Sequence, residues 1–257
     1  MGAAWEEALG RAAGWLRASA STVCLSGAGI STESGIPDFR SRGGFWSRFD
    51  PRDFEIRRWL GSEEVRRRYW AAAREGYKVV SGAAPSAGHA ALARLAGGGR
   101  LSLLVTQNTD GLHQRAGHPP EGLVELHGTS HVCVCAGCGE RLPRPEVQAR
   151  VEAGEEVPCC RGCGGPLKPD AVFFGEAIAP ERLARAVEAA EGAEVFLVVG
   201  SSLAVRPAAA LPERALLRGA RLIIVNAGPT RLDAQAHALL RGRAGEILPP
   251  LAEAALA

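Results

Sequence analysis

The sequence predicts an α/β protein in which a Rossmann-like parallel sheet carries helices on both faces. Apolar runs typical of buried strands lie at 21–26, 101–106, 194–200 and 221–226, and amphipathic helical segments alternate with them. A glycine-containing turn follows the first run directly. Two Cys-x-x-Cys pairs interrupt the alternation, which indicates a small additional module.

Composition limits the possible classes of protein. The chain has 257 residues, 46% of them hydrophobic, enough for one large domain or one large and one small domain. Its net charge of +2 predicts no specific nucleic-acid partner. No apolar run reaches membrane-spanning length, and the N-terminal segment carries Glu6 and Glu7 without a signal-like apolar stretch. We therefore expect a soluble, cytoplasmic protein with no membrane partner, and we expect a monomer.

The order of the elements follows from hydrophobic periodicity and from glycine and proline punctuation. Trp5, Leu9 and Leu16 lie at helical spacing in the first segment. We expect helices over 3–18, 53–60, 62–80, 85–96, 180–191, 207–218 and 247–256, and strands over 21–26, 101–106, 123–126, 170–174, 194–200 and 221–226. Repeated strand–helix units predict parallel strands. The expected Rossmann-like domain comprises 1–42, 81–130 and 167–257, with a cofactor loop and helical insert at 43–80 and a zinc-binding module at 131–166.

The cysteines cluster in a pattern typical of a structural metal site. Cys135, Cys138, Cys160 and Cys163 form two Cys-x-x-Cys pairs, each followed by glycine. Four thiolates fill the tetrahedral shell of Zn²⁺ and leave no position for water, so we expect a zinc ribbon without a catalytic role. A disulfide pair or free buried cysteines are the alternatives.

Three neighbouring residues complicate the choice of metal ligands. Cys133 and Cys159 are additional cysteines that make the register ambiguous, and the x-x spacing selects the four residues above. His131 is close in sequence, but we interpret it as an ordinary residue because four cysteines suffice. Cys24 stands alone in a strand and is expected to pack in the core.

The turn after the first strand resembles a phosphate-binding loop. Gly27 and Gly29 would let the backbone approach a pyrophosphate, and a helix after them would direct free N–H groups and a positive dipole end at the anion. Thr32 stands where the dinucleotide fingerprint has its third glycine, so the turn alone is weak evidence.

Four motifs together carry a resemblance to a known family. GAGIS at 27–31, SGIPDFR at 34–40, QNTD at 107–110 and ELHG at 125–128 occur in the order and spacing of the sirtuins, the NAD-dependent protein lysine deacylases. The resemblance runs from about Ser19 to Leu251. It implies NAD as co-substrate and acyl-lysine proteins or peptides as substrates.

The expected catalytic residues are His127, Asn108 and Asp110. His127 ends a predicted strand at the sheet edge that also carries Asn108 and Asp110. An imidazole titrates near neutrality, which suits a general base for a sugar hydroxyl. The resemblance implies that the acyl oxygen attacks C1′ of the nicotinamide ribose as nicotinamide leaves, and that His127 then activates a ribose hydroxyl. Asn108 would orient the ribose and a water. The implied products are lysine, nicotinamide and O-acyl-ADP-ribose.

The resemblance also implies an NAD site along the strand ends. Asp110 and the Thr109 backbone would hold the nicotinamide carboxamide, and Phe39 would screen the ribose after nicotinamide leaves. The loop at 41–51 is expected to close over the cofactor. The expected NAD-contacting residues are Gly27, Ala28, Gly29, Ser31, Pro37, Asp38, Phe39, Arg40, Trp46, Gln107, Asn108, Thr109, Asp110, Gly200, Ser201, Ser202, Asn226, Ala227, Gly228 and Ala244.

A substrate edge follows the cysteine module. By resemblance, an acyl-lysine peptide would add as a strand between Gly175–Glu176 and Leu203–Val205, and the Val172 carbonyl would accept the substrate Nε–H. The expected substrate-contacting residues are Tyr69, Val172, Phe173, Phe174, Gly175, Glu176, Leu203 and Val205.

Finer details resemble the class II branch, which includes mitochondrial lipoamidase- and ADP-ribosyltransferase-like members. These details are Arg68-Tyr69-Trp70, VNAGPTRLD at 225–233 and GEILP at 245–249. Some relatives place Tyr-x-x-Arg in the acyl pocket, where the arginine pairs with an acidic acyl chain. Here Ala72 occupies the arginine position, so we expect no preference for succinyl or glutaryl groups.

Two other functions remain open from the sequence. A protein mono-ADP-ribosyltransferase would use the same NAD site with a different acceptor. A zinc-ribbon binding module on an inert NAD fold is a different class, and the low net charge and the intact Asn108, Asp110 and His127 set argue against it. His89, His113, His118 and His237 are interpreted as surface or packing residues.

Overall fold

The computed structural model describes residues 3–39, 41 and 43–257. Its main sheet has six strands in the order β3-β2-β1-β7-β8-β9, and every pairing is parallel. The strands are β1 (Thr22–Ser26), β2 (Leu103–Thr106), β3 (Leu123–Glu125), β7 (Val195–Val199), β8 (Arg221–Asn226) and β9 (Ala238–Arg241). From β1 at the centre of the sheet, β2 and β3 are added in order toward one edge, and β7, β8 and β9 are added in order toward the other. The strand order therefore reverses between β1 and β7, which is where ligands of such sheets bind.

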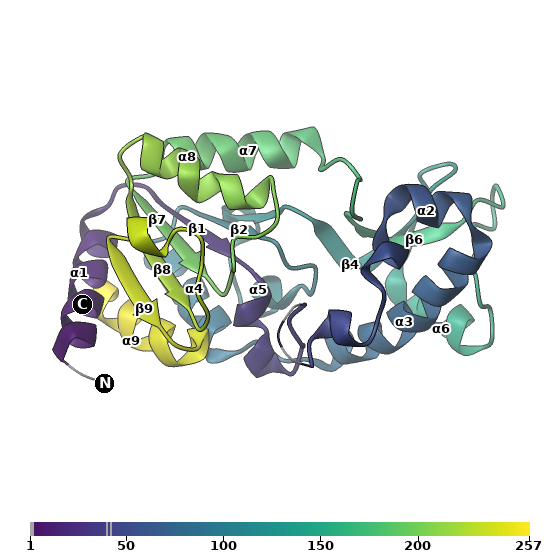
Figure 1. Ribbon diagram of the computed structural model, residues 1–257, viewed down its shortest axis with the longest axis horizontal. Helices are drawn as coiled ribbons and strands as arrows, with labels where there is room; N and C mark the ends of the chain where they lie inside the picture. The colour runs from purple at the N-terminus through teal and green to yellow at the C-terminus, as the bar shows by residue number, and fades with distance from the viewer. Residues whose placement is uncertain (1–2, 40, 42) are drawn as a thin grey trace.

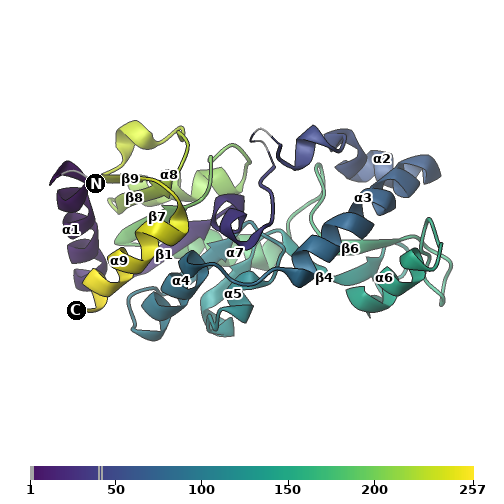
Figure 2. The ribbon, with the colours of Figure 1, turned by 90° about the horizontal axis from the view of Figure 1, so that it is seen from below.

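Helices cover both faces of this sheet, as the α/β prediction requires (Figures 1 and 2). One face packs against α1 (Ala3–Ala18), α4 (Ala87–Gly97) and α9 (Ala244–Leu256), and the other against α7 (Pro180–Glu191) and α8 (Leu211–Leu217). Successive strand side chains point to opposite faces. Cys24 accordingly packs in the first core, while Val23 and Leu25 pack in the second. The predicted fold class is confirmed.

A second, smaller body lies at the other end of the molecule (Figure 1). It contains a three-stranded antiparallel sheet of order β5-β4-β6 and three helices. The elements are α2 (Ile56–Gly61), α3 (Glu63–Gly82), β4 (Gly128–Cys135), β5 (Arg141–Pro143), α6 (Arg144–Glu152) and β6 (Leu167–Ala171). Trp59 and Trp70 of the helical insert pack in one core with Val147 and Leu167 of the cysteine module. The Trp70 indole donates to the Leu167 carbonyl at 3.1 Å, so the two insertions share one hydrophobic core.

The helix expected after the glycine turn is not an α-helix. Two short 3₁₀ turns follow instead, Ala28–Ile30 and Thr32–Ser34. The Thr32 hydroxyl donates to the Gly29 carbonyl, and Gly35 ends the second turn at φ 83°. Side-chain bonding to the backbone and a left-handed residue both oppose helix growth. The expected helix dipole at this turn was therefore wrong.

Several boundaries also differ from expectation. The strand expected over 170–174 ends at Ala171, because Phe174 leaves the small sheet and its N–H donates to the Phe54 carbonyl. The helix expected over 53–60 divides into a 3₁₀ turn, Pro51–Phe54, and α2. The helix expected over 207–218 begins as the 3₁₀ turn Ala208–Ala210 before α8.

Some short elements had not been predicted. They are β4, β5, β9, α5 (Leu112–Arg115) and the 3₁₀ turns Phe45–Ser47, Pro120–Gly122 and Asp233–Gln235. Most are three or four residues long, too short to show a period. Within the described residues, no helix has the length and apolarity needed to cross a membrane.

Candidate active site

The turn after β1 packs directly against the end of β7. The Gly27 N–H donates to the Val199 carbonyl at 2.9 Å and the Gly29 N–H to the Gly200 carbonyl at 2.8 Å. A Cβ atom on Gly29 would lie 2.7 Å from Gly200 Cα. These glycines are therefore required by the approach of two backbone segments of the protein itself.

Three backbone N–H groups at this junction are free. In the part of the chain that the structure describes, the amides of Ala28, Ser201 and Ser202 have no hydrogen-bond partner. Unpaired amides that follow the ends of parallel strands are suited to phosphate oxygens. The residues present therefore fit a pyrophosphate-containing ligand, with Ala28 rather than the two glycines offering the free N–H group of the turn.

A buried polar network joins the turn to the segment after β2. The Ser31 hydroxyl donates to Asp110 Oδ2 at 2.7 Å and accepts from Asn108 Nδ2 at 3.1 Å. Asn108 Nδ2 also lies 3.3 Å from the Gly27 carbonyl oxygen, and Asp110 Oδ1 accepts from the Leu112 N–H at 3.0 Å. All three polar side chains are buried, so these contacts hold Asn108 and Asp110 in fixed orientations.

His127 follows β3 and reaches back to β2. Its Nδ1 lies 3.1 Å from the Gln107 carbonyl oxygen. A carbonyl can only accept, so Nδ1 carries the proton and Nε2 presents a lone pair. Within the described residues Nε2 has no hydrogen-bond partner. Burial lowers the pKa of His127, partly offset by the Gln107 hydrogen bond, and both features suit a neutral general base.

Gln107 and Thr109 fix the edge between His127 and the β7 loop. Gln107 Nε2 donates to Ser201 Oγ at 2.9 Å and lies 3.2 Å from the Ser26 carbonyl oxygen. The Thr109 and Ser130 hydroxyls lie 2.7 Å apart. The end of β2 is thus joined to β1, the β7 loop and β4.

Aromatic side chains cluster in the loop that follows the turn after β1. The Trp46 and Phe39 rings are tilted against each other with centroids 5.4 Å apart, and the Trp46 backbone N–H donates to the Phe39 carbonyl at 3.1 Å. The Trp46 ring also contacts Phe54 at 5.1 Å and Phe174 at 5.9 Å. Phe39 keeps 45% of its surface exposed, so its ring is available to a ligand.

The other expected NAD residues lie on neighbouring loops. Asn226 ends β8, and its Nδ2 donates to the Gly228 carbonyl at 2.8 Å. Ala227 follows it and is exposed, whereas Ala244 is buried at the start of α9. Pro37 is exposed, and Asp38 Oδ1 accepts from the Ser41 N–H at 2.8 Å. Arg40 lies outside the described residues.

The expected substrate edge leaves one backbone acceptor open. The Val172 N–H donates to the His127 carbonyl at 2.9 Å, while the Val172 carbonyl has no partner in the described parts of the chain. Gly175 adopts φ 75°. On the loop after β7, Leu203 is buried with φ 55°, a left-handed conformation that side chains seldom adopt, and Val205 is half-buried.

Tyr69 lies inside the core shared by the two insertions. Its ring contacts Phe173 at 4.9 Å, Phe54 at 5.1 Å and Trp59 at 6.3 Å. Phe173 is buried, whereas Phe174 is 42% exposed. Phe173 therefore belongs to the aromatic lining around Tyr69, and Phe174 faces outward beside Trp46.

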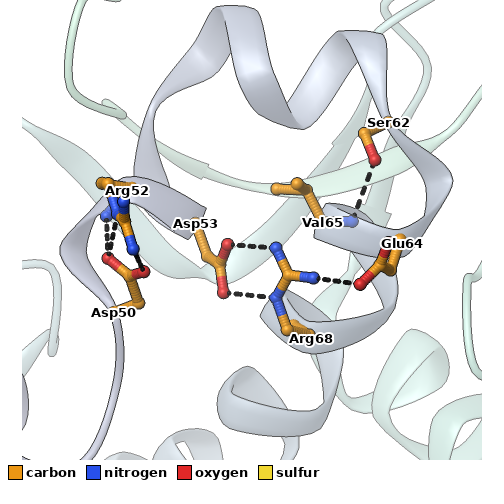
Figure 3. Close-up of polar contacts among 7 residues, drawn as sticks. All are labelled: Asp50, Arg52, Asp53, Ser62, Glu64, Val65 and Arg68. Carbon is orange, nitrogen blue, oxygen red and sulfur yellow. Dashed lines mark hydrogen bonds and ion pairs between the residues drawn. The ribbon is translucent and has the colours of Figure 1, made fainter.

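A cavity of about 410 Å³ is lined by Phe54 and Ala72 and by charged side chains, which are Arg48, Asp50, Arg52, Asp53, Arg58 and Arg68. Each of the three nitrogens of the Arg68 guanidinium donates to a carboxylate (Figure 3). Its Nε and Nη2 donate to the two oxygens of Asp53 at 2.9 and 2.8 Å, and Nη1 donates to Glu64 at 2.6 Å. Asp53 is buried, so this arginine serves to neutralise it.

Three of the four histidines interpreted as surface or packing residues are buried. His89 receives the Ser86 N–H at Nδ1 (3.1 Å), and its Nε2 lies 3.4 Å from Ser31 Oγ. Its ring lies 4.8 Å from that of His113, and burial lowers the pKa of both. The contact of His89 with the Ser31 network was missed, although the S-x-x-H spacing of a capping box signals where its side chain turns.

The four selected cysteines converge. Their sulfur atoms lie within 4.8 Å of one another, with Cys135 Sγ 3.5 Å from Cys163 Sγ and Cys138 Sγ 3.7 Å from Cys160 Sγ. This donor set fits a tetrahedral thiolate site. Cys133 and Cys159 lie outside the group, and His131 Nε2 instead donates to the Asp110 carbonyl at 2.8 Å.

Comparisons with known proteins agree with this arrangement. The model of the Sir2 family matches residues 27–207. The chain is 46% identical over 230 residues to "NAD-dependent protein deacetylase 2" of Streptomyces coelicolor, covering 88% of this chain and 94% of that protein.

Solved structures are similar over the same length. A Sir2 complex with a p53 peptide and NAD⁺ has a TM-score of 0.85 and 35% identity, covering 93% of this chain and 95% of that one. A Sir2 complex with a deacetylated p53 peptide and 3′-O-acetyl ADP-ribose has a TM-score of 0.88 and 35% identity, covering 94% and 96%. This chain belongs to the Sir2 family.

Proposed function

We propose that the protein is an NAD-dependent protein lysine deacylase that transfers the acyl group to ADP-ribose and releases nicotinamide. The observation that carries the proposal is the free Nε2 of His127, held neutral at the sheet edge beside Asn108 and Asp110. The deacetylase name of the Streptomyces relative and the solved complexes with NAD⁺ and with acetyl ADP-ribose support it.

Each part of the site has a proposed role. The free N–H groups of Ala28, Ser201 and Ser202 would bind phosphate oxygens. When bound, NAD supplies the ribose carbon that accepts the acyl oxygen and the hydroxyl that later takes the acyl group. His127 would keep its proton on Nδ1 and take the hydroxyl proton on Nε2. The free Val172 carbonyl would accept the substrate Nε–H.

Five further proposals concern the metal, the acyl chain, the branch of the family, the location and the oligomeric state. The cysteine group would hold a structural Zn²⁺. Acidic acyl chains would be disfavoured, because Ala72 replaces the usual arginine and all three nitrogens of Arg68 are already bound to carboxylates. Membership of the class II branch, a cytoplasmic location and a monomeric state are hypotheses that rest on the sequence.

The test is nicotinamide release from NAD with acetyl-, lipoyl- and succinyl-lysine peptides, for the wild type and His127→Ala. We expect sustained peptide-dependent release by the wild type and little release with succinyl-lysine. In the variant release should stop after a single turnover, because His127 acts after nicotinamide leaves. Mass spectrometry identifies the acceptor. ADP-ribose on the acyl group supports deacylation, whereas ADP-ribose on protein would favour the mono-ADP-ribosyltransferase.

A further inference from the structure

One of the two lysines in the chain is buried beside the expected substrate edge. Lys168 on β6 has a side chain only 6% exposed, whereas the side chain of Lys78 is 51% exposed. An ammonium group in the protein interior is costly unless it is paired and all its donors are used. The surroundings of Lys168 must therefore satisfy it.

The Lys168 ammonium group has three acceptors within reach. Nζ donates to the Ala171 carbonyl at 2.9 Å and the Pro169 carbonyl at 3.2 Å, and it pairs with Glu176 Oε2 at 3.1 Å. An ammonium has three N–H donors, so its hydrogen-bonding capacity is filled. It also lies 4.7 Å from the ring centre of Phe173, in cation–π range.

Glu176 connects the Lys168 ammonium group to the backbone of the expected substrate edge. The same oxygen, Oε2, accepts from the Phe173 N–H at 2.8 Å. The Glu176 N–H donates back to the Phe173 carbonyl at 3.0 Å, and the Phe174 amide and carbonyl pair with the segment at 54–56. Among the carbonyls of 171–174, only that of Val172 is left without a partner in the described chain.

We propose that Lys168 is a positioning residue for the acyl-lysine substrate, acting through Glu176. This inference rests on the proposed deacylase function. Lys168 and Glu176 hold the segment 171–176 so that the Val172 carbonyl stays open to the substrate Nε–H. They also keep the Phe173 ring against Tyr69, within the cluster of aromatic side chains around Tyr69. NAD does not depend on this segment, because the free amides expected to hold it lie on the turn after β1 and the loop after β7.

The test separates peptide binding from NAD binding. Lys168→Met removes the charge and keeps the length of the side chain. We expect its KM for an acetyl-lysine peptide to rise roughly ten-fold or more, since a hydrogen-bonded charge is lost, while its KM for NAD stays within about two-fold of wild type. Lys168→Arg, which keeps the charge, should recover part of the loss. Lys78→Met, the matched control, should behave as wild type.

The outcomes distinguish the inference from the function on which it rests. No turnover by the wild-type protein would overturn both. Normal wild-type turnover with an unchanged peptide KM in Lys168→Met, or with equal rises in both KM values, would overturn the positioning role alone. If thermal melting shows that Lys168→Met does not fold, Glu176→Gln and Lys168→Arg decide, since each should raise the peptide KM selectively. Unchanged peptide KM values in both would reject the inference.

Discussion

The Nδ1 atom of His127 lies 3.1 Å from the carbonyl oxygen of Gln107, and this contact determines which nitrogen of the imidazole can act as a base. The proton must sit on Nδ1, because a carbonyl oxygen has none to give. Nε2 is then the basic atom. Gln107 also contacts Ser201 through its side chain, so one residue orients the base and joins it to the β7 loop.

Replacing His127 with alanine should lower turnover by about 10²- to 10⁴-fold, the usual contribution of a general base. NAD binding should persist, because the free amides at the β1–β7 junction are untouched. Stopped-time assays of nicotinamide release and calorimetric titration with NAD measure the two quantities. His237→Gln, at an exposed histidine, is the control. Full turnover by His127→Ala would refute the assignment.

The acidic limb of the pH profile should lie below pH 6.5. Burial lowers the pKa of His127 from its ordinary value of 6.5, so the ring stays neutral to a lower pH than a free imidazole. A base must be neutral to act, and activity should therefore be lost only below 6.5. The measurement is kcat/KM for the acyl peptide against pH. Half-loss above pH 6.5 would contradict the predicted direction.

Buried histidines should make the fold sensitive to acid. Burial lowers the pKa of His89 to about 4 and that of His113 well below 6.5. Between about pH 6.5 and 4 these histidines are protonated in the unfolded chain but neutral in the folded chain. The free energy of unfolding should therefore fall as pH drops through this range. Urea unfolding at several pH values measures this. His89→Gln should show a shallower fall than wild type, and an equal slope would count against the role of His89.

The sequence predicted those features that have a strong local signal. Apolar strands such as β7 and β8 were predicted because runs of five and four consecutive apolar residues, all of them buried in the structure, leave few alternatives. The four cysteines were selected by spacing alone, and their sulfur atoms converge. The short β9 and the 3₁₀ turns after Gly27 carry no periodicity, since tertiary contacts and single side-chain bonds determine them. In the site, the sequence motifs were sufficient to identify Asn108 and His127 as candidate residues. The contact between Ser31 and His89 and the pairing of Arg68 with Asp53 could not be predicted, because these residues are distant in sequence and come together only on folding.

Gly29→Ala should destabilise the protein and weaken NAD binding. The added Cβ would lie 2.7 Å from Gly200 Cα, closer than packed atoms allow, so the two backbone segments must separate. Overpacking of this kind costs roughly 1–3 kcal/mol. Gly10→Ala is a matched control, because α1 leaves open space at that position and alanine favours a helix by roughly 0.5–1 kcal/mol. Chemical denaturation of both variants measures the difference, and equal stabilities would show that the β1–β7 contact tolerates a side chain.

Removal of the proposed Zn²⁺ should unfold the smaller body before it affects NAD binding. Cys135 and Cys160 of the cysteine group pack in the core that also contains Trp59 and Trp70, so loss of a bound Zn²⁺ should expose these indoles. Cys138→Ser should lower the zinc content measured by atomic absorption and lower the melting temperature. Cys24→Ser, a buried cysteine far from the group in sequence, controls for loss of a thiol. A wild-type zinc content in Cys138→Ser would exclude this ligand.

The acyl preference can be tested by adding the arginine that the chain lacks. Ala72 is buried on α3 and lines the 410 Å³ cavity together with Phe54. The neighbouring Arg68 is already paired within the protein, because each of its three nitrogens donates to Asp53 or Glu64 (Figure 3). Arg48, Arg52 and Arg58 also line the cavity, and Ala72→Arg would add a further guanidinium at the position where some relatives carry one. We expect the ratio of kcat/KM for succinyl- to acetyl-lysine peptides to rise roughly ten-fold or more, as for a new charge-assisted hydrogen bond.

Ala72→Met separates charge from volume in that experiment. Methionine fills comparable space without a hydrogen-bond donor. If the new side chain only blocks the cavity, kcat/KM for the succinyl- and acetyl-lysine peptides should both fall in Ala72→Met, and their ratio should stay at the wild-type value. A rise in the ratio for arginine alone would assign the discrimination to the missing charge at position 72. Equal ratios for arginine and methionine would show that acidic chains are recognised elsewhere. A high ratio in the wild type would show that an arginine already lining the cavity, Arg48, Arg52, Arg58 or Arg68, pairs with the acidic chain.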